Sequence, residues 1–308
     1  MRLVFAGTPG PAAVALERLI ASDHEVVAVL TRPDARKGRG RTLHPSPVKA
    51  VALEHDIEVL TPNKLDDDTA ARLREIAPDA IPVVAYGNLI PEHMLDIPVH
   101  GWVNLHFSLL PRWRGAAPVQ AAIREGDAKT GATTFRIDKG LDTGDILATL
   151  TDTVRDDDTS GALLERLAYS GADLLAQTMD GLEAGSITPQ PQPADGTYAP
   201  KIATADARID WSADAEVIDH AVRAHTPAPG AWTMRGEDRF KVGPLTITDT
   251  SALAPGEVSF GKNEVRVGTG SADVVLEQVQ APGKKMMNAA DWARGLADDV
   301  RAEGMRFQ

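Results

Sequence analysis

The sequence of 308 residues contains no cysteine. This absence excludes disulfides, cysteine-ligated zinc, iron–sulfur clusters and thiol nucleophiles. No apolar run approaches the roughly 18 residues that a membrane-spanning helix needs. The first residues, 1–7, are too few and too interrupted by glycine and proline to form a signal peptide. We therefore expect a cytoplasmic protein, with no membrane segment, whose chemistry uses other groups.

Positive charge and aromatic side chains are also scarce. There are 32 Lys and Arg against 44 Asp and Glu, which gives a net charge of -12. This balance argues against a general nucleic-acid binder, and 5 Trp, 3 Tyr and 6 Phe are too few to favour a base-stacking platform. Residues 32–49 are the exception, because six basic residues there oppose the single acid Asp34.

Several familiar motifs are missing. The turn from Gly7 to Gly10 lacks the dinucleotide fingerprint, because Pro9 occupies a position where a glycine must let the backbone approach a pyrophosphate. No P-loop and no Gly-x-Ser-x-Gly elbow occurs. The eight histidines do not follow metal-ligand spacing, so we expect no metal site.

The first part of the chain alternates short apolar strands with helical patterns, which predicts an α/β fold with a doubly wound sheet. Helical spacing covers residues 11–21, 47–55 and 68–76. Expected strands lie at residues 2–5, 26–30, 57–60, 80–85, 102–106 and 132–137. The last three are almost continuously apolar, which is typical of a parallel sheet covered on both faces.

The pattern changes after a long helical stretch at residues 163–182 and a Pro-rich connector at 187–196. Beyond residue 209, short strands alternate with turn residues, which predicts a small barrel or sandwich. We therefore predict three parts: a catalytic domain at 1–189, a linker at 190–208 and an all-β domain at 209–308.

Two polar residues stand on one expected core strand. Period-two alternation places Asn104 and His106 on the same face, close to the strand end where ligands bind in open α/β sheets. One such residue is as often a hydrogen-bonded core residue as a functional one, but two together favour a site. An amide donor beside an imidazole suits a developing oxyanion and proton transfer near neutral pH, as in acyl-type transfer.

Two further segments are candidates by position. Asp142 lies between glycines in the turn-rich stretch 138–145, where a loop folded back toward the strand ends could pair it with His106. The spacing alone leaves a solvated loop equally open. The basic residues Arg36, Lys37, Arg39 and Arg41 are separated by glycines and suggest a flexible loop. Such loops are usually just solvated, but on an acidic chain this one favours contact with the phosphates of a polyanion.

Together these segments resemble the methionyl-tRNA formyltransferase family of folate-dependent formyltransferases, over essentially the whole chain. The resemblance rests on residues 4–9, 32–49, 84–87, 104–118, 140–145, 198–201, 207–211 and 282–285. Two positions depart from the family pattern: Pro11 replaces a usual Phe, and Phe107 fills a position that is often small.

The resemblance implies formyl transfer from 10-formyltetrahydrofolate to the amino group of methionine on initiator tRNA. It implies a Rossmann-like N-terminal domain and an OB-like, tRNA-binding barrel at the C-terminus. The folate would be a co-substrate, with no permanently bound cofactor, and we expect a monomer. The implied site consists of catalytic Asn104, His106 and Asp142, folate-binding Ser108, Leu109, Leu110 and Pro111, and tRNA-binding Arg36, Lys37, Arg39 and Arg41.

Two alternatives remain at this point. Another formyltransferase that uses the same folate, with a sugar-nucleotide or purine-precursor acceptor, would share the Asn-x-His segment. A catalytically inert tRNA-binding protein would keep only the binding surface. The presence of Asn104, His106 and Asp142 together weighs against the inert protein.

Overall fold

A computed structural model describes residues 1–37, 42–297 and 305–308. The chain divides into two compact units, each made of segments that are discontinuous in sequence. The first unit consists of Met1–Pro118, Lys129–Thr153 and Leu164–Ala199. The second consists of Val119–Ala128, Val154–Leu163 and Pro200–Gln308. The boundaries at 189 and 209 stay a prediction.

A seven-stranded sheet with the order β10-β9-β7-β6-β1-β2-β5 forms the centre of the first unit. Its strands are β1 Arg2–Gly7, β2 Glu25–Leu30, β5 Glu58–Leu60, β6 Ile81–Val84, β7 Trp102–His106, β9 Lys129–Arg136 and β10 Ile146–Thr153. The five strands from β5 to β7 are parallel. Their order places the topological switch between β1 and β6, and ligands bind beyond the carboxyl ends of such strands.

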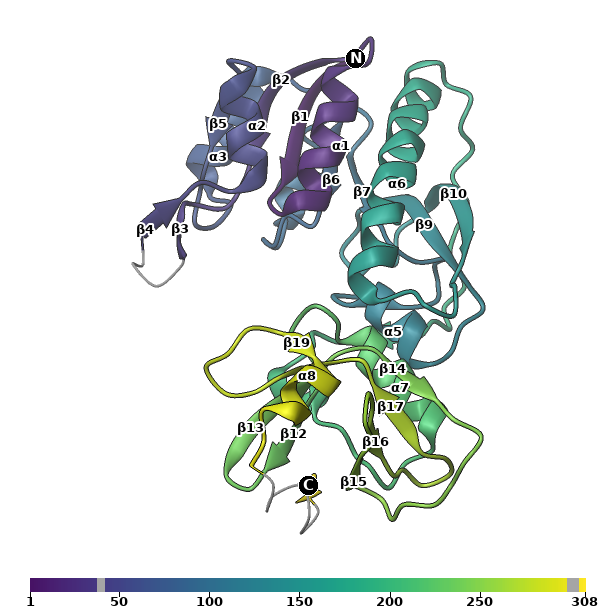
Figure 1. The fold of residues 1–308 in the computed structure, drawn as a ribbon. Helices are drawn as coiled ribbons and strands as arrows, with labels where there is room; N and C mark the ends of the chain where they lie inside the picture. The colour runs from purple at the N-terminus through teal and green to yellow at the C-terminus, as the bar shows by residue number, and fades with distance from the viewer. Residues whose placement is uncertain (38–41, 298–304) are drawn as a thin grey trace. The chain divides into compact units, whose positions relative to one another are not determined.

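Helices cover both faces of this sheet. They are α1 Gly10–Ile20, α2 Pro47–Glu54, α3 Asp67–Ile76, α4 Glu92–Leu95 and, from Leu164 on, α6 Ser160–Glu183. The helix α5 Pro118–Arg124 belongs to the second unit from Val119 on. Val4 and Ala6 of β1 share a core with α3. On the other face, α1 packs beside α2. It also lies against β1 (Figure 1), so closely that a Cβ on Gly7 of β1 would lie 2.7 Å from the Cβ of Ala12 in α1. The predicted doubly wound, Rossmann-like domain is therefore confirmed. No helix in the described ranges has the length and apolar character to cross a membrane.

The strand expected at 132–137 is antiparallel to its neighbours, whereas the sequence predicted a parallel strand. It belongs to β9, which pairs antiparallel with β7 and with β10. The prediction was wrong because a continuous apolar run shows that both faces are covered but carries no information on strand direction. As a result, the link from β9 to β10 at residues 137–145 is the loop of an antiparallel pair.

The basic segment is also more ordered than predicted. The strands β3 Ala35–Lys37 and β4 Thr42–His44 pair as an antiparallel hairpin, with Arg36 opposite Leu43. This corrects the expectation of a wholly flexible loop for Arg36 and Lys37. Arg39 and Arg41 lie outside the described residues.

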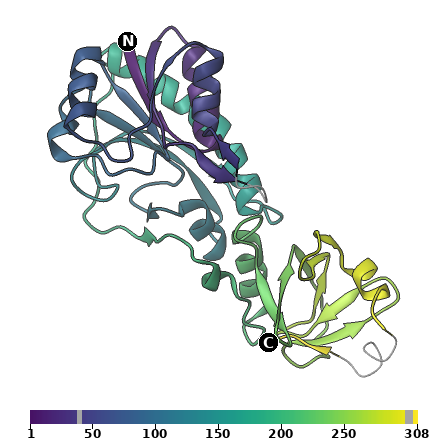
Figure 2. The same cartoon turned by 90° about the vertical axis from the view of Figure 1, so that its left-hand side faces the viewer.

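The second unit contains the predicted all-β domain, whose strands curve around their own core in Figure 2. One sheet has the order β12-β13-β18-β19 and the other β14-β17-β16-β15-β20. The strands are β12 Trp232–Arg235, β13 Asp238–Val242, β14 Leu245–Ile247, β15 Glu257–Phe260, β16 Val265–Val267, β17 Val274–Leu276, β18 Gln278–Gln280, β19 Met287–Asn288 and β20 Met305–Arg306. The helices are η1 Thr204–Ala207, α7 Ala215–Ala224 and α8 Ala289–Arg294. Phe240, Trp292 and Phe307 lie in the core that the two sheets share.

Candidate active site

Asn104 and His106 lie on the same face of β7, as the sequence predicts. In the register of β7 and β9, Asn104 is opposite Phe135 and His106 is opposite Thr133. Leu105 points to the other face of the sheet, because a Cβ on Gly171 of α6 would lie 3.2 Å from its methyl groups. The same Cβ would lie 3.4 Å from the ring of Phe107. The departure at Phe107 is therefore on the opposite face from the two polar side chains.

A backbone carbonyl orients the His106 ring. Nε2 of His106 lies 2.8 Å from the carbonyl oxygen of Trp113. A carbonyl only accepts hydrogen bonds, so Nε2 carries the proton and the neutral ring keeps its lone pair on Nδ1. Trp113 has a left-handed backbone, φ 62, in the loop that follows β7. Sequence reasoning missed this partner, because a backbone carbonyl has no signature in the sequence.

Asp142 faces the other nitrogen of the ring. The antiparallel register places the start of loop 137–145 beside the start of β7, yet the loop folds back toward the strand end. Asp142 Oδ2 lies 3.9 Å from His106 Nδ1 and accepts a 2.7 Å hydrogen bond from the backbone N–H of Gly115. The predicted pair of Asp142 and His106 thus forms at ion-pair distance, while the ring-orienting hydrogen bond comes from Trp113.

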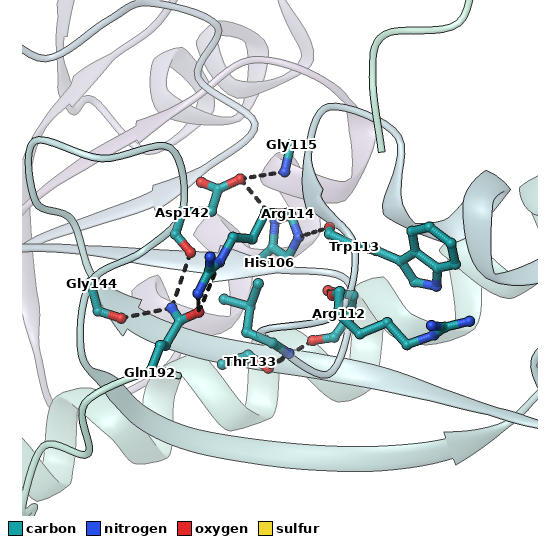
Figure 3. A network of polar contacts seen from close by, with 11 residues as sticks. His106, Arg112, Trp113, Arg114, Gly115, Thr133, Asp142, Gly144 and Gln192 are labelled. Carbon is teal, nitrogen blue, oxygen red and sulfur yellow. Dashed lines mark hydrogen bonds and ion pairs between the residues drawn. The ribbon is translucent and has the colours of Figure 1, made fainter. Parts of the chain in front are cut away.

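The environment keeps His106 neutral and ready to accept a proton. Its side chain is only 6% exposed, and burial lowers the pKa of His106 below its ordinary value. The charge of Asp142 and the Trp113 carbonyl raise this pKa but do not offset burial. Figure 3 shows the ring between these two groups. A proton that arrives on Nδ1 faces the carboxylate, which stabilises the imidazolium.

The Asn104 amide is available for a ligand. The side chain is half-buried, and no other described residue forms a hydrogen bond with it. Buried amides usually have protein or water partners. An amide N–H left over beside a buried imidazole can donate to an oxygen that gains negative charge.

Thr133 of β9 forms hydrogen bonds with the segment predicted to bind folate, residues 108–111. The Thr133 hydroxyl donates to the Ser108 carbonyl at 2.7 Å and accepts from the Leu110 N–H at 3.2 Å. Ser108 is fully buried, and its hydroxyl donates to the Arg112 carbonyl at 2.6 Å. Leu110 is buried as well, whereas Leu109 and Pro111 are half-buried. Across the described parts of the chain, no group of three or more His, Asp or Glu side chains is arranged to hold a metal ion.

Two residues that the sequence analysis did not single out complete the network in Figure 3. Arg114 lies on the short strand β8 Arg114–Gly115, which pairs with β11 Tyr198–Ala199. Its guanidinium donates to the side chain of Gln192, and Gln192 in turn contacts the loop of Asp142. The first ten residues of the predicted linker, 190–199, belong to the first unit. Gln192 had no signal in the sequence, because it is 50 positions from Asp142 in a Pro-rich connector.

The cations of the basic segment differ in their exposure. Lys49 forms a 2.8 Å ion pair with Asp34. Arg32 donates to the Asn63 carbonyl at 2.9 Å and to the side chain of Asn88. These two cations therefore form contacts within the first unit. Arg36 is exposed on the hairpin.

Known protein families match most of this chain. A family model described as formyl transferase matches residues 1–179, and one described as formyl transferase, C-terminal domain, matches residues 201–297. The methionyl-tRNA formyltransferase of Corynebacterium aurimucosum is 65% identical over 99% of this chain and 98% of its own. The chain belongs to the methionyl-tRNA formyltransferase family. The resemblance seen in the sequence is confirmed.

Solved structures share the fold of this formyltransferase. The methionyl-tRNA formyltransferase from Clostridium thermocellum has a TM-score of 0.56 and 18% identity, over 90% of this chain and 98% of its own. HypX from Aquifex aeolicus in complex with tetrahydrofolic acid has a TM-score of 0.64 and 18% identity, over 96% of this chain and 47% of that longer protein. At these identities the likeness concerns the fold.

Proposed function

We propose that this formyltransferase transfers the formyl group of 10-formyltetrahydrofolate to the amino group of methionine on initiator tRNA. One observation carries the proposal. A buried, neutral imidazole faces a carboxylate at 3.9 Å, in a chain of the methionyl-tRNA formyltransferase family. The same strand face carries an amide to which no other described residue forms a hydrogen bond. This set of groups supplies what transfer of a formyl group to an amine needs.

The reaction requires one proton to leave the amine and one to reach the folate. As the amine nitrogen bonds to the formyl carbon, His106 Nδ1 accepts the amine proton, and Asp142 stabilises the imidazolium. The formyl oxygen gains negative charge at this stage, and the Asn104 amide donates to it. When the bond from the formyl carbon to N10 of the folate breaks, His106 returns its proton to N10. The residues are then restored, and formylmethionyl-tRNA and tetrahydrofolate leave.

We assign the folate and the tRNA to different parts of the chain. We assign catalysis to the predicted domain 1–189, with folate contacts from Leu109 and Pro111, and part of the tRNA binding to the domain 209–308. Arg36, Lys37, Arg39 and Arg41 would contact tRNA phosphates. We propose that the enzyme acts as a monomer in the cytoplasm, where its tRNA substrate is charged.

A formylation assay tests the function. The purified chain is incubated with 10-formyltetrahydrofolate and methionine-charged initiator tRNA, and the product is deacylated and analysed for N-formylmethionine. We expect turnover with this tRNA and none with uncharged tRNA, glycinamide ribonucleotide or an amino-sugar nucleotide. Turnover with one of the small acceptors but not with tRNA would contradict the proposed acceptor. Binding of tRNA without turnover would indicate an inert tRNA-binding protein.

A further inference from the structure

Arg114 is a buried cation whose described partners are all neutral. Its side chain is 2% exposed. Nε and Nη2 donate to Gln192 Oε1 at 3.2 and 3.0 Å, and Nη2 also donates to the Pro193 carbonyl at 2.9 Å. Burial of a charge is costly unless hydrogen bonds compensate. This guanidinium is thus committed to the segment that contains Gln192.

The Gln192 amide connects Arg114 to the loop of Asp142. Its Nε2 donates to the carbonyl oxygens of Asp142 at 3.0 Å and Gly144 at 2.7 Å. The amide orientation is determined, because a flipped amide would point donors at Arg114 and an acceptor at two carbonyls. Arg114 therefore selects the amide orientation, and the amide binds the loop on both sides of Thr143.

The loop needs such a restraint. Asp142 has a left-handed backbone, φ 55, and its neighbour Leu141 is 60% exposed. The carboxylate of Asp142 has one hydrogen bond in the described structure, from the N–H of Gly115. Since Gly115 follows Arg114 on β8, the same short strand restrains the carboxylate directly and the loop backbone through Gln192.

We propose that Gln192 and Arg114 are positioning residues that hold the Asp142 carboxylate in place opposite His106. The inference rests on the proposed function and extends it to the segment after the catalytic domain. Neither residue touches the substrates in this role. They act through the position of a carboxylate that stabilises the protonated ring of His106, so their loss lowers kcat and leaves substrate binding intact.

Gln192→Glu tests the contact between Gln192 and the loop of Asp142 separately from the contact with Arg114. Glu keeps the acceptor for Arg114 but replaces the two loop donors with an oxygen that faces two carbonyls. Gln192→Leu removes the acceptor for Arg114 as well as the two loop donors. Because Leu is uncharged, this variant shows whether the added charge of Glu causes the effect. The matched control is Gln190→Leu, because Gln190 lies two residues away, is exposed, and its amide donates to the nearby Thr188 carbonyl.

We expect both Gln192 variants to lower kcat by about 10- to 100-fold, the scale on which a small displacement of a catalytic group acts. KM for the charged tRNA and for the folate should change by less than about threefold, and Gln190→Leu should match the unmodified chain. The decisive measurement is a double-mutant cycle. In an Asp142→Asn background, Gln192→Glu should lower kcat by less than about threefold, because the carboxylate that it positions is absent.

The outcomes separate the two proposals. If the unmodified chain formylates charged tRNA but both Gln192 variants keep their kcat, the positioning role is overturned. The same conclusion follows if the loss is equally large in the Asp142→Asn background, which would indicate a general structural effect. If the unmodified chain and Gln190→Leu both lack activity, it is the proposed function that fails.

Discussion

His106 and Trp113 form the hydrogen bond that determines which ring nitrogen takes part in proton transfer. The Trp113 carbonyl accepts from Nε2 at 2.8 Å, so Nδ1 keeps the lone pair and faces Asp142 at 3.9 Å. In the neutral ring this lone pair faces a negative charge, whereas in the imidazolium an N–H does. The arrangement thus favours the protonated ring once the amine has given up its proton, and burial keeps the resting ring neutral.

The first prediction concerns Asp142→Asn and pH. Activity needs neutral His106, so the rate falls as pH decreases through the pKa of this residue. The Asp142 charge raises that pKa, and removing the charge lowers it further. We therefore expect the acidic limb of kcat/KM to move to lower pH, while the maximal rate falls by about 10-fold or more because the imidazolium is less stable. A profile measured from pH 5 to 9 checks both effects.

Two results would contradict this prediction. An acidic limb that moves to higher pH would show that the Asp142 charge does not stabilise protonated His106. An unchanged rate and profile would show that Asp142 is an ordinary loop residue. Asn is the suitable replacement, because it tolerates the left-handed backbone at this position.

The second prediction separates Asn104 from His106. Replacing either residue with Ala should lower turnover by at least about 100-fold, the scale of losing an oxyanion donor or an acid–base group. The affinity for charged tRNA should change little. In Asn104→Ala the acidic limb should keep its position, because the ring is unaltered. Near-normal turnover of folded His106→Ala would remove this residue from the mechanism.

The third prediction concerns Thr133, whose hydroxyl holds the loop after β7. Thr133→Val keeps the shape of the side chain but leaves the Ser108 carbonyl and the Leu110 N–H without this partner. We expect the free energy of unfolding to fall by about 1–3 kcal/mol, the cost of unsatisfied buried groups. The control is Thr151→Val, at an exposed position on β10, which should change it by less than about 0.5 kcal/mol. Urea denaturation of both variants measures the difference, and equal stability would exclude this role for Thr133.

The sequence predicted those parts of the site that depend on local periodicity. Alternation along one strand places Asn104 and His106 together, since successive strand residues point to opposite faces. The pair of Asp142 and His106 could be suggested only as one option, because it depends on a loop that folds back against the register of β9. The direction of β9 itself was missed, since apolar content reports burial alone.

The remaining contacts could not be predicted from the sequence, for physical reasons. Trp113 acts through its carbonyl, which every residue possesses, and its position depends on the turn that follows β7. Arg114 and Gln192 meet because β8 pairs with β11, a contact between segments about 80 residues apart. Lys49 and Arg32 counted as part of a positive segment, but their charges are tied to neighbouring oxygens in the folded first unit.

The last prediction concerns the basic hairpin. Changing Arg36, Lys37, Arg39 and Arg41 to Ser should weaken binding of charged tRNA and reduce its salt dependence. Each lost phosphate contact lowers the slope of log affinity against log salt concentration by roughly 0.7–0.9. Folate binding should be unaffected, because the uncharged residues Leu109 and Pro111 are proposed to contact the folate.

A matched pair of variants tests whether the position or only the charge matters. Arg36→Ser with Lys37→Ser removes two charges from the described stem of the hairpin. Lys64→Ser with Arg74→Ser removes two charges from exposed positions elsewhere in the same unit. Filter binding at several salt concentrations should show a smaller slope for the hairpin pair and an almost unchanged slope for the control pair, since a charge that contacts no phosphate does not contribute to the slope. If the four-residue variant keeps the affinity, salt slope and formylation rate of the unmodified chain, the hairpin does not contact tRNA, and acceptor binding must come from the all-β domain.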